Sequence, residues 1–168
     1  MTTHPIIDRH NDSGSIVIKH KTIEWTLPDG DNISINLGTV GVIGIYTTDS
    51  GPYADDWFLA FVHSNGAWQE ISVYADGYDE LTSYLSGLYD TDLTTPSLTS
   101  STVWASAIRY PKHLAGKELF VLQPPKGYKP PTNLLQILKS GLGIGAYGKD
   151  WEMALTDWVK SELEKTGT

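Results

Sequence analysis

The sequence contains no cysteine, which excludes a disulfide scaffold, a thiol nucleophile and any metal site built on thiolates. Its apolar runs are far shorter than the roughly 18 residues that a membrane-spanning helix needs. No apolar core flanked by basic residues occurs near the N-terminus, so we expect no signal peptide. These absences predict a cytoplasmic protein without a membrane partner.

Basic residues are scarce in the first hundred positions, where 14 Asp and Glu stand against 3 Lys and Arg, a balance of −11. The rest of the chain holds 6 against 9, a balance of +3. An acidic surface repels phosphate backbones, so we expect no nucleic-acid partner. It attracts a basic protein and speeds its encounter, although such charge can also serve solubility alone.

The length of 168 residues suits one domain whose core needs no metal or disulfide. We expect residues 1–14 to form a flexible N-terminus and residues 15–123 to form a sheet domain. Residues 124–168 comprise a proline segment and two helical patterns, which we expect to pack on the same domain.

Alternating and β-branched residues predict strands within six stretches. These stretches are 15–27, 32–48, 57–64, 67–74, 102–110 and 117–123. Pro28-Asp29-Gly30 is a turn signal, and Asn65-Gly66 is the strongest hairpin signal in the chain. Gly38, Gly41 and Gly44 recur within one stretch and predict a bend or bulge in its strand.

The period changes after Gly77, where five apolar residues fall on one face of a predicted helix. They are Tyr78, Leu81, Tyr84, Leu85 and Leu88. Two more helices are predicted at 132–141 and 150–165, the second with Asp150 as N-cap. An apolar stripe supports that second helix, formed by Trp151, Leu155, Trp158 and Leu163. We therefore predict an α+β fold with an antiparallel sheet, one packed helix and two C-terminal helices.

Gly143, Gly145 and Gly148 spell G-x-G-x-x-G, the letter pattern of a dinucleotide-binding loop. Such a loop must leave a β-strand and open a helix, so that the helix N-terminus faces the pyrophosphate. Here the glycines follow a predicted helix, with no strand directly before them. We interpret them as a helix C-cap and a turn, and we expect no cofactor.

Several motifs follow one another between Lys21 and Leu93. The first is an Ile-x-Trp strand ("TIEW"), and the second is an Ile-rich strand followed by a Gly-Pro loop ("VIGIYTTDSGPYADD"). Next come a Gly turn, a short strand and a Gly-started helix with paired leucines ("NGAWQEISVYADGYDELTSYLSGL"). This order resembles a group of small uncharacterised bacterial proteins. The resemblance implies a compact antiparallel sheet with a packed helix, loosely similar to pleckstrin-homology-like folds, and it implies no established activity. The proline segment and the C-terminal helices depart from the pattern.

The stretch "DSGPYADDW" concentrates Asp49, Asp55 and Asp56, and His63 follows shortly after. Carboxylates this close could bind a divalent cation or shift each other's pKa for acid/base chemistry. The spacing is not that of a calcium loop, and aspartates of this kind also cap loop backbone. No serine stands in a nucleophile-elbow pattern.

Aromatic residues flank the acidic ones, and aromatic rings beside carboxylates suit protein recognition. The candidate partner-binding residues are Asp49, Tyr53, Asp55, Asp56, Trp68, Asp76, Tyr78, Asp79 and Glu80. These aromatics could equally complete the edge of the core.

The leading hypothesis is a non-enzymatic binding domain, a monomer or homodimer, that engages a basic protein. Within that class a bacterial immunity (antitoxin-like) protein that neutralises a basic toxin is favoured, because fast steered association suits that task. One alternative is a small metal-dependent or acid/base enzyme that uses Asp55, Asp56 and His63. Another is a small-ligand module with a pocket between the sheet and the C-terminal helices.

Overall fold

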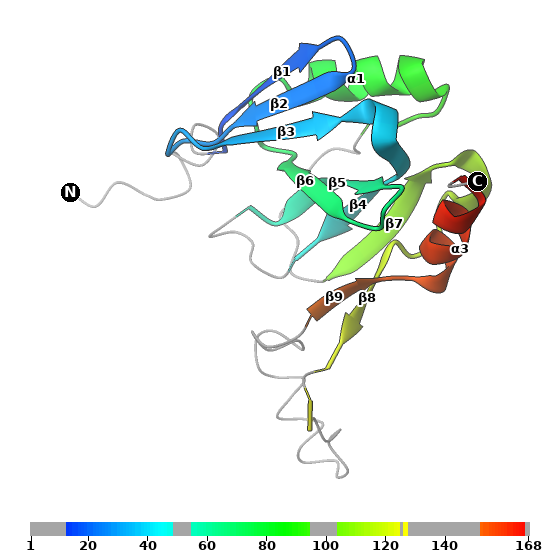
Figure 1. The fold of residues 1–168 in the computed structure, drawn as a ribbon. Helices are drawn as coiled ribbons and strands as arrows, with labels where there is room; N and C mark the ends of the chain where they lie inside the picture. The colour runs from blue at the N-terminus through cyan, green and yellow to red at the C-terminus, as the bar shows by residue number, and fades with distance from the viewer. Residues whose placement is uncertain (1–12, 49–54, 95–103, 125, 128–151, 167–168) are drawn as a thin grey trace.

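The computed structural model of the chain describes residues 13–48, 55–94, 104–124, 126–127 and 152–166. These residues form three antiparallel sheets and two helices, which confirms the predicted α+β fold (Figure 1). The predicted helix at 132–141 and the glycine motif lie outside the described residues.

Sheet A has the strand order β1-β2-β3, and sheet B has the order β6-β5-β4-β7. Sheet A consists of β1 (Ser15–Lys19), β2 (Thr22–Thr26) and β3 (Asn32–Asn36). Sheet B consists of β4 (Val40–Thr47), β5 (Trp57–His63), β6 (Trp68–Ser72) and β7 (Ala105–Tyr110). The third sheet is a ribbon of β8 (Phe120–Gln123) and β9 (Glu152–Leu155). The helices are α1 (Tyr78–Tyr89) and α3 (Asp157–Thr166), and short 3-10 turns span Leu37–Thr39 and Lys112–Leu114.

Turn chemistry explains how the strands connect. The predicted strand stretch 15–27 is a hairpin, because the chain reverses at His20, whose φ of 55° is left-handed. The predicted Asn65-Gly66 turn joins β5 to β6 as expected, with Gly66 at φ 82°. The predicted bulge is also present, since the pairing of β4 shifts register around Gly41 and again at Gly44.

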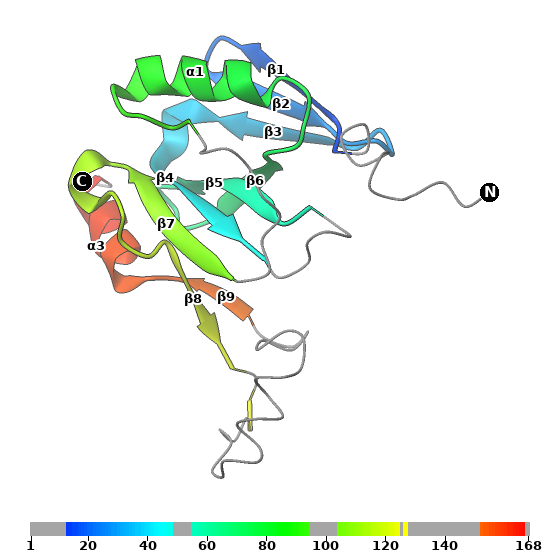
Figure 2. The same cartoon turned by 180° about the vertical axis from the view of Figure 1, so that it is seen from behind.

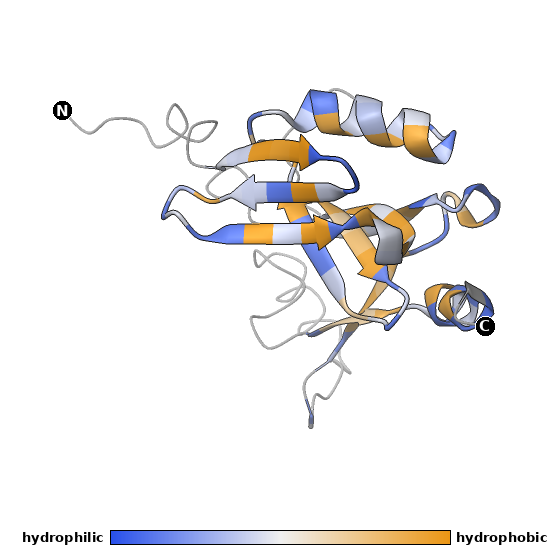
Figure 3. Cartoon of the chain, turned by 45° about the horizontal axis from the view of Figure 1, so that its top comes forward, coloured by the Kyte–Doolittle hydropathy of each residue, from blue (hydrophilic) through white to orange (hydrophobic). Residues whose placement is uncertain are grey.

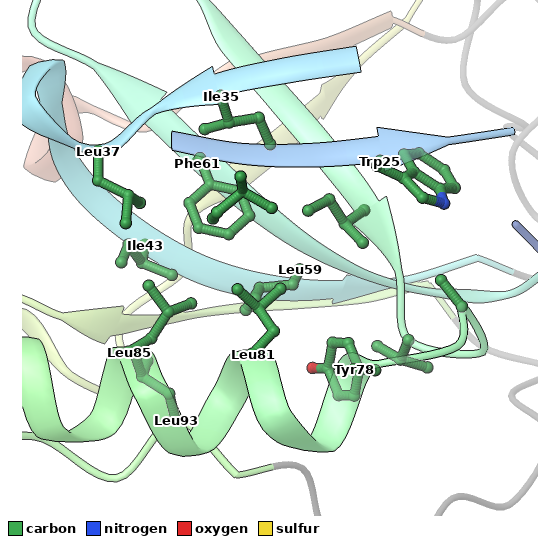
Figure 4. Packing of buried hydrophobic residues seen from close by; sticks show 14 residues of the cluster. Trp25, Ile35, Leu37, Ile43, Leu59, Phe61, Tyr78, Leu81, Leu85 and Leu93 are labelled. Atoms are coloured by element: carbon green, nitrogen blue, oxygen red, sulfur yellow. The ribbon is translucent and has the colours of Figure 1, made fainter. Parts of the chain in front are cut away.

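Sheet B is buried on both faces, which explains the almost continuous apolar character of β4 and β5. Residues of β5 alternate between two hydrophobic clusters: Leu59 and Phe61 belong to one, and Ala60 and Val62 to the other. Sheet A and α1 complete the first cluster, as Figure 4 shows. The β8–β9 ribbon and α3 complete the second, so α1 and α3 lie on opposite sides of sheet B (Figure 2).

The described residues cover sheet A on one face only, so its strands alternate in the usual way. Along β3, Ile33 and Ile35 alternate with polar residues. Figure 3 shows hydrophobic and hydrophilic bands along the strands. Trp25 of β2 is 6% exposed and donates its Nε1–H to the Ser13 carbonyl at 2.8 Å. Because this bond and neighbouring backbone bonds hold Ser13 and Gly14, the end of the predicted flexible segment is tied to the sheet.

The face of α1 differs in part from the prediction. Tyr78, Leu81 and Leu85 are buried as expected, but Tyr84 is 37% and Leu88 is 45% exposed. Buried residues at 78, 81 and 85 follow the i, i+3, i+7 spacing of one narrow stripe, and positions 84 and 88 lie at its side.

The predicted helix at 150–165 is wrong in its first part. Residues Glu152–Leu155 form β9, and the helix begins only at Asp157. Pairing with β8 places Leu155 opposite Phe120 and satisfies the backbone groups that the two strands turn toward each other, which overrides the helical pattern. As a result Leu155 and Leu163 are buried, but Trp158 of the predicted stripe is 54% exposed.

Candidate functional site

Exposed carboxylates gather at one end of sheet A, and we call this set the acidic end. Its members are Asp29, Asp31, Asp76, Asp79 and Glu80. Asp76 is held beside the start of β1, because its N–H donates to Gly14 O at 2.9 Å and its carbonyl accepts from Ile16 N at 2.8 Å. The chain then enters α1 (Figure 2). The first turn of this helix carries Asp79 and Glu80.

The β2–β3 turn brings the other two carboxylates to the same end. Gly14 packs so closely on Thr26, the last residue of β2, that a Cβ at position 14 would lie 2.1 Å from the Thr26 carbonyl oxygen. The turn that carries Asp29 and Asp31 follows directly. The start of β1 is therefore flanked by both acidic segments, which lie far apart in the sequence.

The described cations are placed elsewhere. Lys19 pairs with Glu24 at 2.6 Å at the other end of the β1–β2 hairpin, and Lys112 pairs with Asp90 at 2.7 Å beyond the C-terminus of α1. The sequence contains no Lys or Arg between Lys21 and Arg109, although this stretch supplies every carboxylate of the acidic end. That cation-free stretch is the signal that locates the site, and it is sharper than the charge balance of the first hundred residues.

Asp79 and Glu80 also have a local role. α1 starts after Gly77, which has a φ of 88° and provides no side-chain cap. Negative charge in the first helical turn interacts favourably with the unpaired N–H groups there. These two carboxylates therefore contribute to the helix end as well as to the charge of the surface.

Asp55 and Asp56 point into the protein instead of forming a free acidic loop. Asp55 accepts hydrogen bonds from Ser13 Oγ and Ser72 Oγ, which links the start of β1 to the end of β6. Asp56 is 0% exposed and accepts a hydrogen bond from the Tyr74 hydroxyl. A fully buried carboxylate cannot contact a partner without local rearrangement, so Asp56 holds the sheet end together.

His63 is separated from these aspartates. It closes β5 at the end opposite to Asp56, roughly 20 Å away along the strand. Its Nδ1 lies 2.8 Å from Thr39 Oγ1, and its Nε2 lies 2.9 Å from Gln69 Oε1. Because the Gln69 amide NH₂ donates to Ser34 O, Gln69 Oε1 accepts from the His63 Nε2–H. Asp55, Asp56 and His63 therefore form no common centre, and no group of three or more His, Asp or Glu is placed to hold a metal within the described ranges.

The remaining candidate residues divide between the interior and the undescribed loop. Tyr78 is 5% exposed and belongs to the first core cluster. Trp68 is half-buried, and its ring lies 5.3 Å from that of Phe120 in the second cluster. Asp49 and Tyr53 lie outside the described residues. Of the nine predicted partner-binding residues, the structure thus brings Asp76, Asp79 and Glu80 together on the surface.

Tyr46 of β4 and Glu70 of β6 form an acid–phenol pair, in which the tyrosine is buried and the glutamate is half-buried. The Tyr46 hydroxyl donates to Glu70 Oε2 at 2.6 Å, and Tyr46 is 3% exposed. Burial, together with the adjacent Glu70 carboxylate, raises the pKa of Tyr46 far above its usual range. Tyr46 therefore remains a neutral donor, and it fixes the orientation of Glu70 on β6.

Beside α3 lies an open hollow of ≈ 490 Å³ between the helix and the outer face of the β8–β9 ribbon. Val121, Leu155 and Trp158 supply its apolar lining. The ammonium group of Lys117 lies 3.5 Å from the centre of the Trp158 ring, a cation–π geometry. Polar residues, among them Gln123, Thr156 and Lys160, complete the lining. The hollow is the place for the small ligand of the alternative hypothesis.

Comparison of the chain with protein-family models, curated proteins and solved structures gave no match. The expected resemblance of residues 21–93 to small bacterial proteins therefore stays a prediction. Within the described part of the chain, no helix has the length and apolar character to cross a membrane.

Proposed function

We propose that the protein is a non-enzymatic binding domain whose acidic end recognises a basic protein. The observation that carries the proposal is the convergence of five carboxylates from two segments, with the described Lys and Arg residues placed elsewhere. Such a surface focuses negative potential over one end of the molecule, and it accelerates association with a basic partner.

Within this class we favour a bacterial immunity (antitoxin-like) protein that acts in the cytoplasm by binding a basic toxin. Rapid, electrostatically steered capture is the property that such a protein needs, and binding alone achieves the neutralisation. The separation of Asp55 and Asp56 from His63 supports a binding role over the acid/base alternative, because the three groups cannot act on one substrate atom.

The test is affinity capture from a lysate of the source organism at about 50 mM and about 500 mM salt, followed by mass spectrometry. We expect one basic protein to be retained at low salt and weakened at high salt. An empty column at both salt concentrations would contradict the proposal.

A matched pair of variants then locates the surface. The first combines Asp31→Asn, Asp76→Asn and Glu80→Gln at the acidic end. The control combines Glu118→Gln, Glu152→Gln and Asp157→Asn near β8 and α3, and it changes the net charge by the same amount. Each set includes one residue in the first turn of a helix.

We expect the acidic-end variant to slow association with the captured protein by about tenfold and to flatten its salt dependence. The control should change the rate by less than about threefold, because its charges lie away from the contact. Equal effects of both variants would show that only net charge matters and would remove the assignment of the surface.

A further inference from the structure

Within the described ranges, the outer edge of β6 presents unpaired backbone groups. Among the described strands, β6 pairs with β5 alone, in the register Phe58↔Ser72, Ala60↔Glu70 and Val62↔Trp68. Two further backbone hydrogen bonds show which residues of this segment turn their N–H and C=O groups toward β5. His63 N donates to Ala67 O, and Val73 N donates to Trp57 O.

Alternation along the strand then directs the N–H and C=O groups of Trp68 and Glu70 away from β5. In the part of the chain that the structure describes, these four groups have no hydrogen-bond partner. Ser72 differs, because its carbonyl accepts from Ala75 N and its side chain is covered by Asp55. The open part of the edge is thus two outward-facing residues long, enough for four backbone hydrogen bonds to an added strand.

The other outer edge of sheet B is covered. Ile108 of β7 donates its N–H to Lys117 O and accepts from Gly116 N, and Ser106 Oγ bonds the backbone of Phe120. Proteins commonly block an exposed edge with lysine, proline or a covering segment. β6, with the sequence WQEIS, contains neither lysine nor proline.

Charge decides what kind of strand fits this edge. Glu70 lies on it, and the chain beyond Ser72 leads within a few residues to Asp76, Asp79 and Glu80. Residues 55–94 contain no Lys or Arg. The edge of β9 is less suited to a cationic strand, because Lys160 lines the hollows beside Leu155.

We propose that the basic partner docks an extended segment on β6, adding a fifth strand to sheet B and continuing toward the acidic end. The backbone groups of Trp68 and Glu70 bind the segment, a Lys or Arg opposite Glu70 pairs with its carboxylate, and further basic residues meet the acidic end. This inference rests on the proposed function, since it specifies how the basic partner is held.

The probe is a capped synthetic peptide, Lys-Val-Lys-Val-Lys-Val-Lys, titrated into the isotope-labelled protein at low salt. Hydrogen exchange of the Trp68 and Glu70 amides is measured with and without the peptide. These amides should exchange freely in the free protein and become protected by about tenfold or more on binding. Rapid exchange that persists at saturation, or protection already present in the free protein, would overturn the proposal.

Two N-methylated peptides test the pairing itself. If the lysines of the peptide stand opposite Trp68 and Glu70, the backbone N–H groups of these lysines face β6. Methylation of the backbone nitrogens of the lysines should therefore weaken binding by at least about fivefold. The backbone N–H groups of the valines face away from β6, so methylation of their nitrogens should leave binding unchanged within about twofold. Equal affinities of the two peptides would show that the contact is electrostatic only.

Glu70→Pro removes one outward N–H and no ladder bond with β5, so an edge strand should tolerate it. Glu70→Ala is the matched control, because it removes the same carboxylate and keeps the N–H. Proline should weaken the peptide at least about fivefold more than alanine does. If the proline variant does not fold, the methylated peptides still decide.

The outcomes separate the two proposals. If Glu70→Pro and Glu70→Ala bind the peptide equally while the acidic-end variant binds it weakly, strand addition is wrong and the acidic end remains the site. If the lysate yields no basic partner, the proposed function fails whatever the peptide does. No binding of the peptide at about 1 mM would overturn strand addition alone.

Discussion

Leu81 on α1 offers a direct test of how this helix is held on the two sheets. Its side chain is 0% exposed and lies among residues of sheet A, β5 and α1 (Figure 4). Leu81→Ala removes buried methyl groups and leaves a cavity that the surrounding strands can fill only in part. We expect a loss of about 3 kcal/mol in the free energy of unfolding.

Leu88→Ala is the matched control on the same helix. Leu88 is 45% exposed, so its truncation should cost less than about 1 kcal/mol. Both substitutions replace leucine by alanine in the same helix, so the change in helix propensity cancels in the comparison. The difference between the variants therefore measures burial.

Urea unfolding followed by tryptophan fluorescence is the assay. The midpoint of Leu81→Ala should fall with an unchanged m-value, and its Tm should fall by roughly 6–12 °C for a domain of this size. Similar losses for Leu81→Ala and Leu88→Ala would refute the orientation of α1, and with it the placement of Asp79 and Glu80 at the acidic end.

Two further predictions concern glycines and pH. Gly44→Ala should lower the free energy of unfolding by about 1–3 kcal/mol in urea, because the new Cβ would lie 2.7 Å from Leu119 Cδ2. Gly87 lies on the open surface of α1, so Gly87→Ala should raise the free energy of unfolding by about 0.5 kcal/mol. The opposite order of the two variants would contradict the packing. The hydrogen bond from His113 lowers the pKa of Glu162, so this carboxylate contributes stability that is present above the ordinary glutamate pKa and is lost as pH falls through its lowered folded-state value. Urea midpoints measured from pH 6 down to pH 3 should therefore fall less steeply in Glu162→Gln than in the wild type, and parallel curves would contradict this linkage.

Local signals in the sequence predicted much of the fold. The Asn65-Gly66 turn, the bulge around Gly41 and Gly44, and the start of α1 after Gly77 depend on neighbouring residues and are found where expected. β9 was missed because its partner, β8, is about thirty residues away in the sequence and only the pairing distinguishes EMAL from a helical turn.

The acidic end was only partly predictable, since composition fixes charge but not the direction of a side chain. Asp55 and Asp56 stand next to each other in an acidic stretch, yet hydrogen bonds from Ser72 and Tyr74 turn both inward. Asp29 and Asp31 were not among the predicted contacts, because their proximity to Asp76 depends on the packing of the start of β1 between two distant segments.

Sheet B separates two hydrophobic cores, and this has a consequence for the folding of the chain during its synthesis. The face toward α1 can be completed as soon as residues up to about Leu93 are available, since every member of that buried cluster precedes this point. The opposite face requires Leu155, Val159 and Leu163, which are synthesised last among the described elements. A nascent or C-terminally shortened chain would display Val62, Ile108 and their neighbours to solvent, an apolar surface that favours aggregation. Synthesis of α3 therefore completes the burial of an apolar surface that the shorter chain would expose.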